Sequence, residues 1–286
     1  MSQEQILLPP GTLWTSVKQT TKHALQCGAL QSIPTDFELI EQDGVKFLVR
    51  ILANLNRKKA ATEKQSPDFN PFLPYEQDLF VADISPTHVC ILNKFNVVDH
   101  HLLIITRCFE EQESLLTQAD FAAMGACLAD FPGLVFYNGG KIAGASQRHK
   151  HLQIIPVADT EIPITPLLKT AKFADSLATI PGLPFVHAFT ILNPDEEAEI
   201  TLHKYHQLLQ KVGIQAIDDN LQSGAYNLLA TREWMLIVPR SAEEFTSISV
   251  NALGFAGALL VRNSEQMQLV KEVGPINVLK KVAFPL

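Results

Sequence analysis

The feature that most constrains the fold is a glycine-rich polar loop that runs directly into an alternating strand. Residues 138–156 read NGGKIAGASQRHKHLQIIP. Side chains alternate between the two faces of a strand, so His149, His151 and Gln153 are expected on one face. Leu152, between them, is then expected in the core. The sequence therefore predicts a strand that presents two imidazoles and an amide beside a flexible loop.

This combination of groups favours chemistry on a phosphoryl group. Backbone N–H groups in a glycine-rich loop can bind an anion. Imidazole is an uncharged nucleophile near neutral pH, and it can attack phosphorus or transfer protons. A surface strand that carries two histidines by chance is one alternative. A zinc site is another, but it needs a third ligand, and Gln153 is a poor one; no metal site is expected here.

The whole segment resembles the active-site motif of the histidine triad superfamily, in the branch where glutamine replaces the last histidine. That branch holds the galactose-1-phosphate uridylyltransferases and the diadenosine tetraphosphate phosphorylases, also called ATP adenylyltransferases. The motif is most similar to the phosphorylases, because the sugar-transferring enzymes typically have proline where this chain has Lys150. The resemblance covers most of the chain from about Gly11. It implies an α+β fold, related to galactose-1-phosphate uridylyltransferase, in which helices cover a mixed or antiparallel sheet.

Composition is consistent with such an enzyme. With 286 residues and 47% hydrophobic content, the chain can form one large domain or two small ones. A net charge of −7 argues against a nucleic-acid partner, so a polyphosphate must bind in a local basic pocket. The four cysteines include no Cys-x-x-Cys pair, which predicts neither a zinc ribbon nor disulfides. The chain has no signal pattern and no long apolar run, so a soluble, cytoplasmic protein without membrane partners is expected. We also expect a monomer.

Periodicity and chain breakers predict the main elements. Apolar spacing predicts a helix over 12–27, and Asp43-Gly44 between two apolar runs predicts a hairpin. Thr117, followed three residues later by Asp120, predicts a capped helix. Further strands are expected at 101–107, 135–137 and 185–192 and as a pair over 225–240, with helices near 117–128, 167–177 and 195–212.

One internal echo indicates an ancient duplication. The runs 101–107 and 234–240 are both buried strands that end in arginine and precede acidic residues and a helix-like segment. Two such units with a single histidine motif predict a degenerate second half that has lost the nucleophile. The alternative, that any strand followed by a helix looks similar, stays open. The expected organisation is a catalytic half over 1–165 and a half over 166–286 that completes the nucleotide site.

The resemblance also assigns substrate contacts. Lys58 is expected at the polyphosphate and Asp83 with Ile84 at the ribose, since a carboxylate can accept hydrogen bonds from two vicinal hydroxyls. Without the resemblance, Lys58 belongs to a solvated loop and Asp83 starts a turn. The other expected contacts are Asn138, Gly144, Ala145, Ser146, Gln147, Gln153, Asn251, Ala252, Leu253, Ala258 and Arg262.

The expected reaction is the reversible phosphorolysis of diadenosine tetraphosphate by phosphate to ATP and ADP. His151 is expected to attack through its outer ring nitrogen, with the inner nitrogen bonded to a backbone carbonyl. His149 shapes the site through its own hydrogen bonds, and Gln153 donates to a phosphoryl oxygen without titrating. No covalently bound cofactor is expected, and a divalent cation such as Mg²⁺ is compatible with the chemistry. A sugar-1-phosphate nucleotidyltransferase and a non-catalytic nucleotide sensor stay open as alternatives.

Overall fold

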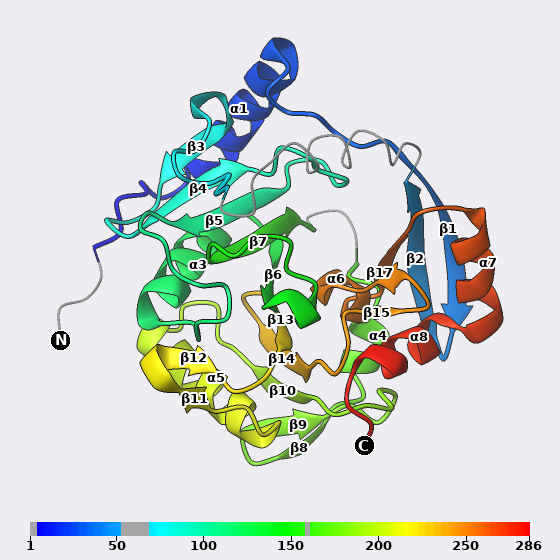
Figure 1. Cartoon of the computed structure of the whole chain (residues 1–286). Coiled ribbons are helices and arrows are strands. Elements are labelled where there is room, and N and C mark those ends of the chain that lie inside the picture. Colours follow the sequence, from blue (N-terminus) through cyan, green and yellow to red (C-terminus); the bar gives the residue numbers. More distant parts are fainter. Residues whose placement is uncertain (1–4, 53–68, 158–160) are drawn as a thin grey trace.

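A computed structural model describes residues 5–52, 69–157 and 161–286. Its main element is a ten-stranded sheet in which every neighbouring pair of strands is antiparallel (Figure 1). In spatial order the strands are β3 (Phe80–Asp83), β4 (His88–Leu92), β5 (Leu102–Thr106), β7 (His151–Pro156), β6 (Gly133–Gly139), β13 (Tyr226–Ala230), β14 (Trp234–Pro239), β10 (Ala188–Ile191), β9 (Leu177–Thr179) and β8 (Lys172–Ala174).

A second, three-stranded sheet stands beside the first (Figure 1). Its strands are β1 (Thr35–Gln42), β2 (Val45–Leu52) and β17 (Ala258–Val261), and β17 is parallel to β2. The helices are α1 (Leu13–Cys27), α3 (Gln118–Asp130), α4 (Thr165–Leu168), α5 (Ala198–Lys211), α6 (Ala252–Phe255), α7 (Ser264–Val273) and α8 (Pro275–Val282), with 3-10 turns η1 (Gln77–Leu79), η2 (Lys141–Ala143) and η3 (Asp218–Asn220). Two short hairpins complete the list: β11 (Ala216–Ile217) with β12 (Leu221–Gln222), and β15 (Glu244–Phe245) with β16 (Ile248–Ser249). The mixed α+β fold expected from the sequence is confirmed.

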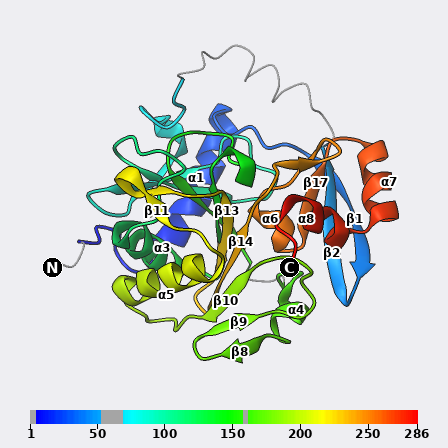
Figure 2. The same ribbon diagram turned by 60° about the horizontal axis from the view of Figure 1, so that its bottom comes forward.

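The long sheet has a helical face and a second face that is only partly covered. Helices α1, α3 and α5 pack on the first face, and α3 and α5 lie side by side (Figure 2). On the opposite face, the three-stranded sheet with α6, α7 and α8 buries the β6–β13–β14–β10 half. A small cluster around Phe72 covers β4 and β5 on that same face. Strand β7 therefore crosses the second face between two apolar clusters, which is where its polar side chains emerge.

The two halves of the long sheet repeat one unit in mirrored order. The series β4-β5-α3-β6-β7 corresponds to β9-β10-α5-β13-β14, and β6 and β13 pair at the centre. A structural repeat is thus visible in the topology, but the sequence echo matched the wrong strands. It aligned the β5 and β14 segments, whereas β14 occupies the place of β7. Strand β14 reads Trp-Met-Leu-Ile-Val-Pro, so the second half has no histidine at the equivalent strand.

Local sequence signals account for several elements. Asp43 and Gly44 adopt φ values of 50° and 77°, as a tight hairpin turn between β1 and β2 requires. Thr117 and Asp120 form the expected capping box at the start of α3. The helices expected over 12–27 and 195–212 and the strand pair over 225–240 are also confirmed.

The helix expected over 167–177 is wrong. Helix α4 ends at Leu168, and the chain then forms the β8–β9 hairpin, with Asp175 at a φ of 58° in the turn. Strand β9 pairs with β10 and buries Ala178 in the core under the second face. Tertiary pairing at a sheet edge therefore overrides a short helical pattern.

Two further observations concern the expected division into halves and the expected absence of a membrane span. The long sheet runs without interruption from β6 to β13, so strands from 1–165 and 166–286 share one sheet. No helix in the described part of the chain is both long and apolar enough to cross a bilayer.

Candidate active site

His151 is the buried centre of the site. It begins β7, its side chain is 4% exposed, and its Nδ1–H donates to the His149 carbonyl at 2.8 Å. Because a carbonyl can only accept, this bond places the ring proton on Nδ1 and leaves the lone pair on Nε2. Nε2 has no hydrogen-bond partner within the described ranges. The expected bond from the inner ring nitrogen to a backbone carbonyl is confirmed, and attack by the outer nitrogen stays a prediction.

Burial also keeps this imidazole neutral. The pKa of His151 falls from 6.5 to about 4, mainly because of burial; the bond to the His149 carbonyl acts to raise it, and the nearby His149 ring acts to lower it. The side chain is therefore unprotonated at neutral pH and carries a usable lone pair. The ring of Phe72 meets that of His151 edge-on, with 5.2 Å between the two ring centroids.

A glutamine that the sequence did not reveal holds the backbone of His151. The Gln112 side chain accepts from the His151 N–H at 2.9 Å and donates to the carbonyls of Asn138 and His151 at 2.9 and 3.3 Å. Gln112 is 1% exposed and lies in the loop after β5. No sequence motif identifies Gln112, because its contacts with His151 and Asn138 depend on how the loop after β5 packs against β7 in the folded chain.

The imidazole ring of His149 is held by hydrogen bonds at both of its nitrogens. Its Nε2–H donates to the Thr106 carbonyl at 2.8 Å, and its Nδ1 lies 2.9 Å from the amide nitrogen of Asn70. The edges of Phe72 and Phe109 flank its ring. Burial lowers the pKa of His149. Both ring nitrogens are thus engaged, which argues against a zinc site shared by His149 and His151.

Asn138, at the end of β6, joins the glycine-rich loop to the C-terminal half. Its Oδ1 accepts from Asn227 Nδ2 and from the backbone N–H of Ala252, both at 2.9 Å. Asn227 in turn donates to the Ala143 carbonyl and accepts from the buried Arg240 guanidinium at 2.6 Å. Burial lowers the pKa of Arg240 to about 10, so it stays charged at neutral pH. Neither Asn227 nor Arg240 was expected in this region.

The loop itself packs tightly at Gly144, which has a φ of 91°. A Cβ at this position would lie 2.8 Å from the Val250 carbonyl oxygen and 3.0 Å from Asn251 Cα. Only glycine fits both the backbone conformation and the space. Tertiary structure thus brings together two runs that the sequence separates by about a hundred residues, the 138–147 loop and the start of α6. Ala145 and Gln147 are half-buried and Ser146 is exposed.

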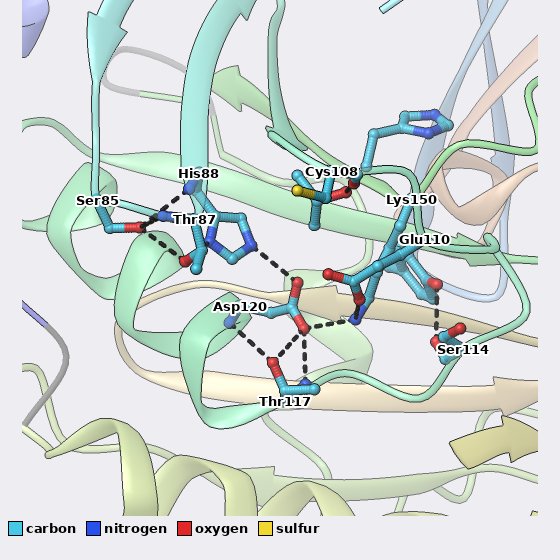
Figure 3. Close-up of polar contacts among 12 residues, drawn as sticks. Ser85, Thr87, His88, Cys108, Glu110, Ser114, Thr117, Asp120 and Lys150 are labelled. Carbon is cyan, nitrogen blue, oxygen red and sulfur yellow. Dashed lines mark hydrogen bonds and ion pairs between the residues drawn. The ribbon is translucent and has the colours of Figure 1, made fainter. Parts of the chain in front are cut away.

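Lys150 points to the opposite side of β7 and is buried in a polar cluster (Figure 3). Its ammonium lies 2.7 Å from Asp120 Oδ2 and 3.1 Å from Glu110 Oε2, and it also donates to the Leu115 carbonyl. Asp120 further accepts from His88 Nε2 at 3.1 Å. Burial acts to raise the pKa of Asp120, but the His88 hydrogen bond and the Lys150 charge hold it well below its usual range. The cluster therefore ties β7 to β4 and to the start of α3.

The two residues expected at the ribose behave differently. Asp83 ends β3 with an exposed carboxylate that pairs with the Arg107 guanidinium. Ile84 is fully buried, and its side chain lies in the core under the helical face. Contact of either residue with ribose stays a prediction. Arg107, the residue after β5, was not among the expected site residues. The sequence analysis noted it only as an arginine at the end of a strand.

The remaining expected contacts lie around α6 and β17. Asn251 caps α6 by accepting from the Leu253 N–H at 3.0 Å, and Ala252 is buried while Leu253 and Ala258 are half-buried. Arg262 is exposed just after β17. Lys58 lies outside the described residues. These assignments stay predictions.

Among the described residues, one group could in principle bind a metal ion. The donor atoms of His23, Cys27 and Asp78 lie within 4.8 Å of one another, on α1 and η1. All three are exposed, and the His23 ring is already paired with the Asp78 carboxylate at 2.7 Å. The group contains none of the residues around His151.

Comparison with known proteins gives a consistent result. The chain is 29% identical to diadenosine tetraphosphate phosphorylase 2 of Saccharomyces cerevisiae over 71% of this chain and 72% of the relative. It is 28% identical to Protein APA1 of the same yeast over 96% of this chain and 95% of the relative. The crystal structure of yeast Ap4A phosphorylase Apa2 matches with a TM-score of 0.81 at 24% identity, over 97% of this chain and 96% of that one. Structures of the same yeast protein in complex with AMP and with Ap4A match with the same score.

The family models cover nearly the whole chain. Residues 3–170 match the Ap4A phosphorylase N-terminal domain, and residues 181–285 match the ATP adenylyltransferase C-terminal domain. The histidine motif lies in the first match, and the α6–β17 segment lies in the second. The chain therefore belongs to the Ap4A phosphorylase family and is a nucleotidyltransferase of the ATP adenylyltransferase type.

Proposed function

We propose that this protein phosphorolyses diadenosine tetraphosphate to ATP and ADP, reversibly, through a covalent AMP–His151 intermediate. The observation that carries the proposal is the state of the His151 ring, which is buried and neutral, with its proton held on Nδ1 and its lone pair on Nε2. Family membership supplies the substrate class, because Ap4A is the molecule bound in one structure of the yeast relative.

In the first step His151 Nε2 attacks the α-phosphorus of the dinucleotide. The N–P bond forms as the bond from that phosphorus to the bridging oxygen breaks, and ATP leaves with the electron pair. The ring gains positive charge as it attacks, and the His149 carbonyl stabilises that charge through Nδ1–H. Nδ1 keeps its proton, so no general base is needed to activate the nucleophile.

In the second step an oxygen of inorganic phosphate attacks the same phosphorus. The N–P bond breaks, the electron pair returns to Nε2, and ADP is released. Donors around the phosphoryl oxygens stabilise both steps. The expected donors are the backbone N–H groups of the 144–147 loop and the side-chain amide of Gln153.

The absence of a third histidine should protect the intermediate from water. Histidine triad hydrolases carry that histidine where this chain has Gln153. An amide has no pKa near neutrality and cannot act as a general base, so Gln153 cannot activate a water molecule. The AMP–histidine should therefore persist until phosphate arrives.

The decisive experiment omits phosphate. Intact-protein mass spectrometry after incubation with diadenosine tetraphosphate should record a mass increase of one AMP, and added phosphate should release that AMP as ADP. His151→Ala should give no adduct, and His151→Gly with added imidazole should recover part of the transfer. Steady release of AMP without phosphate, at a rate comparable to phosphorolysis, would identify a hydrolase. Release of a nucleotide-sugar only when a hexose phosphate replaces phosphate would identify a sugar-nucleotide transferase.

We also propose the setting in which the enzyme works. Its four cysteines are unpaired, as expected in a reducing cytoplasm. The net charge of −7 disfavours nucleic acid as a partner, and we expect a monomer. The chemistry needs no covalently bound cofactor, although a divalent cation such as Mg²⁺, bound with the polyphosphate, would neutralise part of its charge.

A further inference from the structure

We propose that His101 and Asn93 form a hydrogen-bond relay that fixes the orientation of the Gln153 side-chain amide, with its nitrogen toward the reacting phosphate. His101 is 8% exposed and immediately precedes β5, and Gln153 lies on the neighbouring strand β7. The inference rests on the proposed function for its consequence, but its geometric content can be tested without substrate. It makes Asn93 and His101 positioning residues for the reaction.

The relay begins at a backbone N–H group, which can only donate a hydrogen bond. The backbone N–H of Phe95 donates to Asn93 Oδ1 at 3.3 Å. This bond identifies the oxygen of the Asn93 amide, so the amide nitrogen is the atom 3.3 Å from His101 Nδ1. An amide nitrogen can only donate, which makes His101 Nδ1 an acceptor without a proton.

The missing proton on His101 Nδ1 determines the remaining hydrogen bonds of the relay. A neutral imidazole that accepts at Nδ1 carries its proton at Nε2. His101 Nε2 lies 3.0 Å from Gln153 Oε1 and therefore donates to it. The oxygen of the Gln153 amide is thereby occupied by His101, and its –NH₂ group is the end left for a ligand. In the described part of the chain this –NH₂ group has no hydrogen-bond partner.

The orientation matters because the two ends of an amide have opposite effects on a phosphate. The –NH₂ group donates to a phosphoryl oxygen, whereas the carbonyl oxygen repels it. If His101 carried its proton on Nδ1, its Nε2 would accept from Gln153 and would turn the carbonyl oxygen toward the site. Gln153 alone thus does not determine whether the site stabilises or repels the phosphoryl charge, and the relay does.

The Asn93→Asp variant tests the relay because it keeps the shape and the acceptor for Phe95 but replaces the donor with an acceptor. Neutral His101 should then carry its proton on Nδ1, facing the new carboxylate. We expect kcat for phosphorolysis to fall about 100-fold at pH 9, as for the loss of one donor to a reacting oxyanion. Asn193→Asp is the matched control, because Asn193 also follows an Ile-Leu pair at the end of a strand but donates to Glu196.

A double-mutant cycle separates positioning from a structural role. If Asn93 acts through the amide, Asn93→Asp should have no further effect on kcat in a Gln153→Ala background. An equal fold-loss in both backgrounds would overturn the proposal. Nitrogen-15 NMR of labelled histidine provides the second readout, since it identifies which ring nitrogen of His101 is protonated in the unmodified protein. A proton on Nδ1 there would also overturn it.

The two readouts keep this inference distinct from the proposed function. An unmodified protein that forms no AMP adduct would refute the function, while the NMR measurement would still decide the polarity of the relay. An active protein with Nε2–H at His101, yet with full activity in Asn93→Asp at pH 9, would retain the function and refute the relay.

Discussion

The clearest quantitative consequence of the site concerns how the rate of the first step depends on pH. The rate should begin to fall at a much lower pH than it would for an ordinary histidine nucleophile. Burial lowers the pKa of His151 from 6.5 to about 4, so the nucleophile should lose its lone pair only near pH 4. At pH 5.5 an ordinary histidine would be about 9% neutral, and His151 should be about 97% neutral. The first-step rate should therefore be nearly unchanged between pH 7.5 and 5.5, where an exposed nucleophile would lose about tenfold.

The assay is a single turnover without phosphate, in which the AMP adduct is followed by intact-protein mass spectrometry. Diadenosine tetraphosphate suits it because the molecule has no terminal phosphate group to titrate near pH 6. His23→Asn, at an exposed position on α1, should have the same profile. An acid limb near 6.5 in both proteins would mean that the nucleophile is solvated, and it would refute the reasoning from burial.

Three further predictions concern charge and backbone. Lys150→Met should lower the free energy of unfolding in urea by about 3–5 kcal/mol, because Asp120 stays buried without its main counter-charge; the added change Asp120→Asn should recover part of the loss, and full additivity would contradict the pairing. Gly144→Ala should cost about 1–3 kcal/mol in the same assay and reduce adenylylation, since a φ of 91° strains any other residue and a backbone carbonyl lies 2.8 Å from the new Cβ. Lys58→Met should raise the Michaelis constant for diadenosine tetraphosphate more than the inhibition constant for AMP; equal weakening would place Lys58 away from the polyphosphate.

Local chemistry made several parts of this protein predictable from the sequence. The hairpin at Asp43-Gly44 and the capping box at Thr117 depend on residues a few positions apart, so their signals are written in short runs. The same holds for β7, because strict alternation places His151 and Gln153 on one face wherever the strand packs. The carbonyl that holds the His151 ring belongs to residue 149, only two positions earlier in the chain.

Tertiary structure decided everything that depends on which segments become neighbours. Lys150 reads as a polar residue between two histidines, but the packing of α3 against β7 turns it into a buried ion pair with Asp120. Arg240 and Asn138 meet through Asn227 because β13 lies between their strands, and no local pattern specifies that order. The hairpin after α4 formed for the same reason, since an available sheet edge outweighs a weak helical preference. Propensity and alternation act over a few residues, whereas strand order and burial are properties of the whole chain, and they determined how the parts of this site assemble.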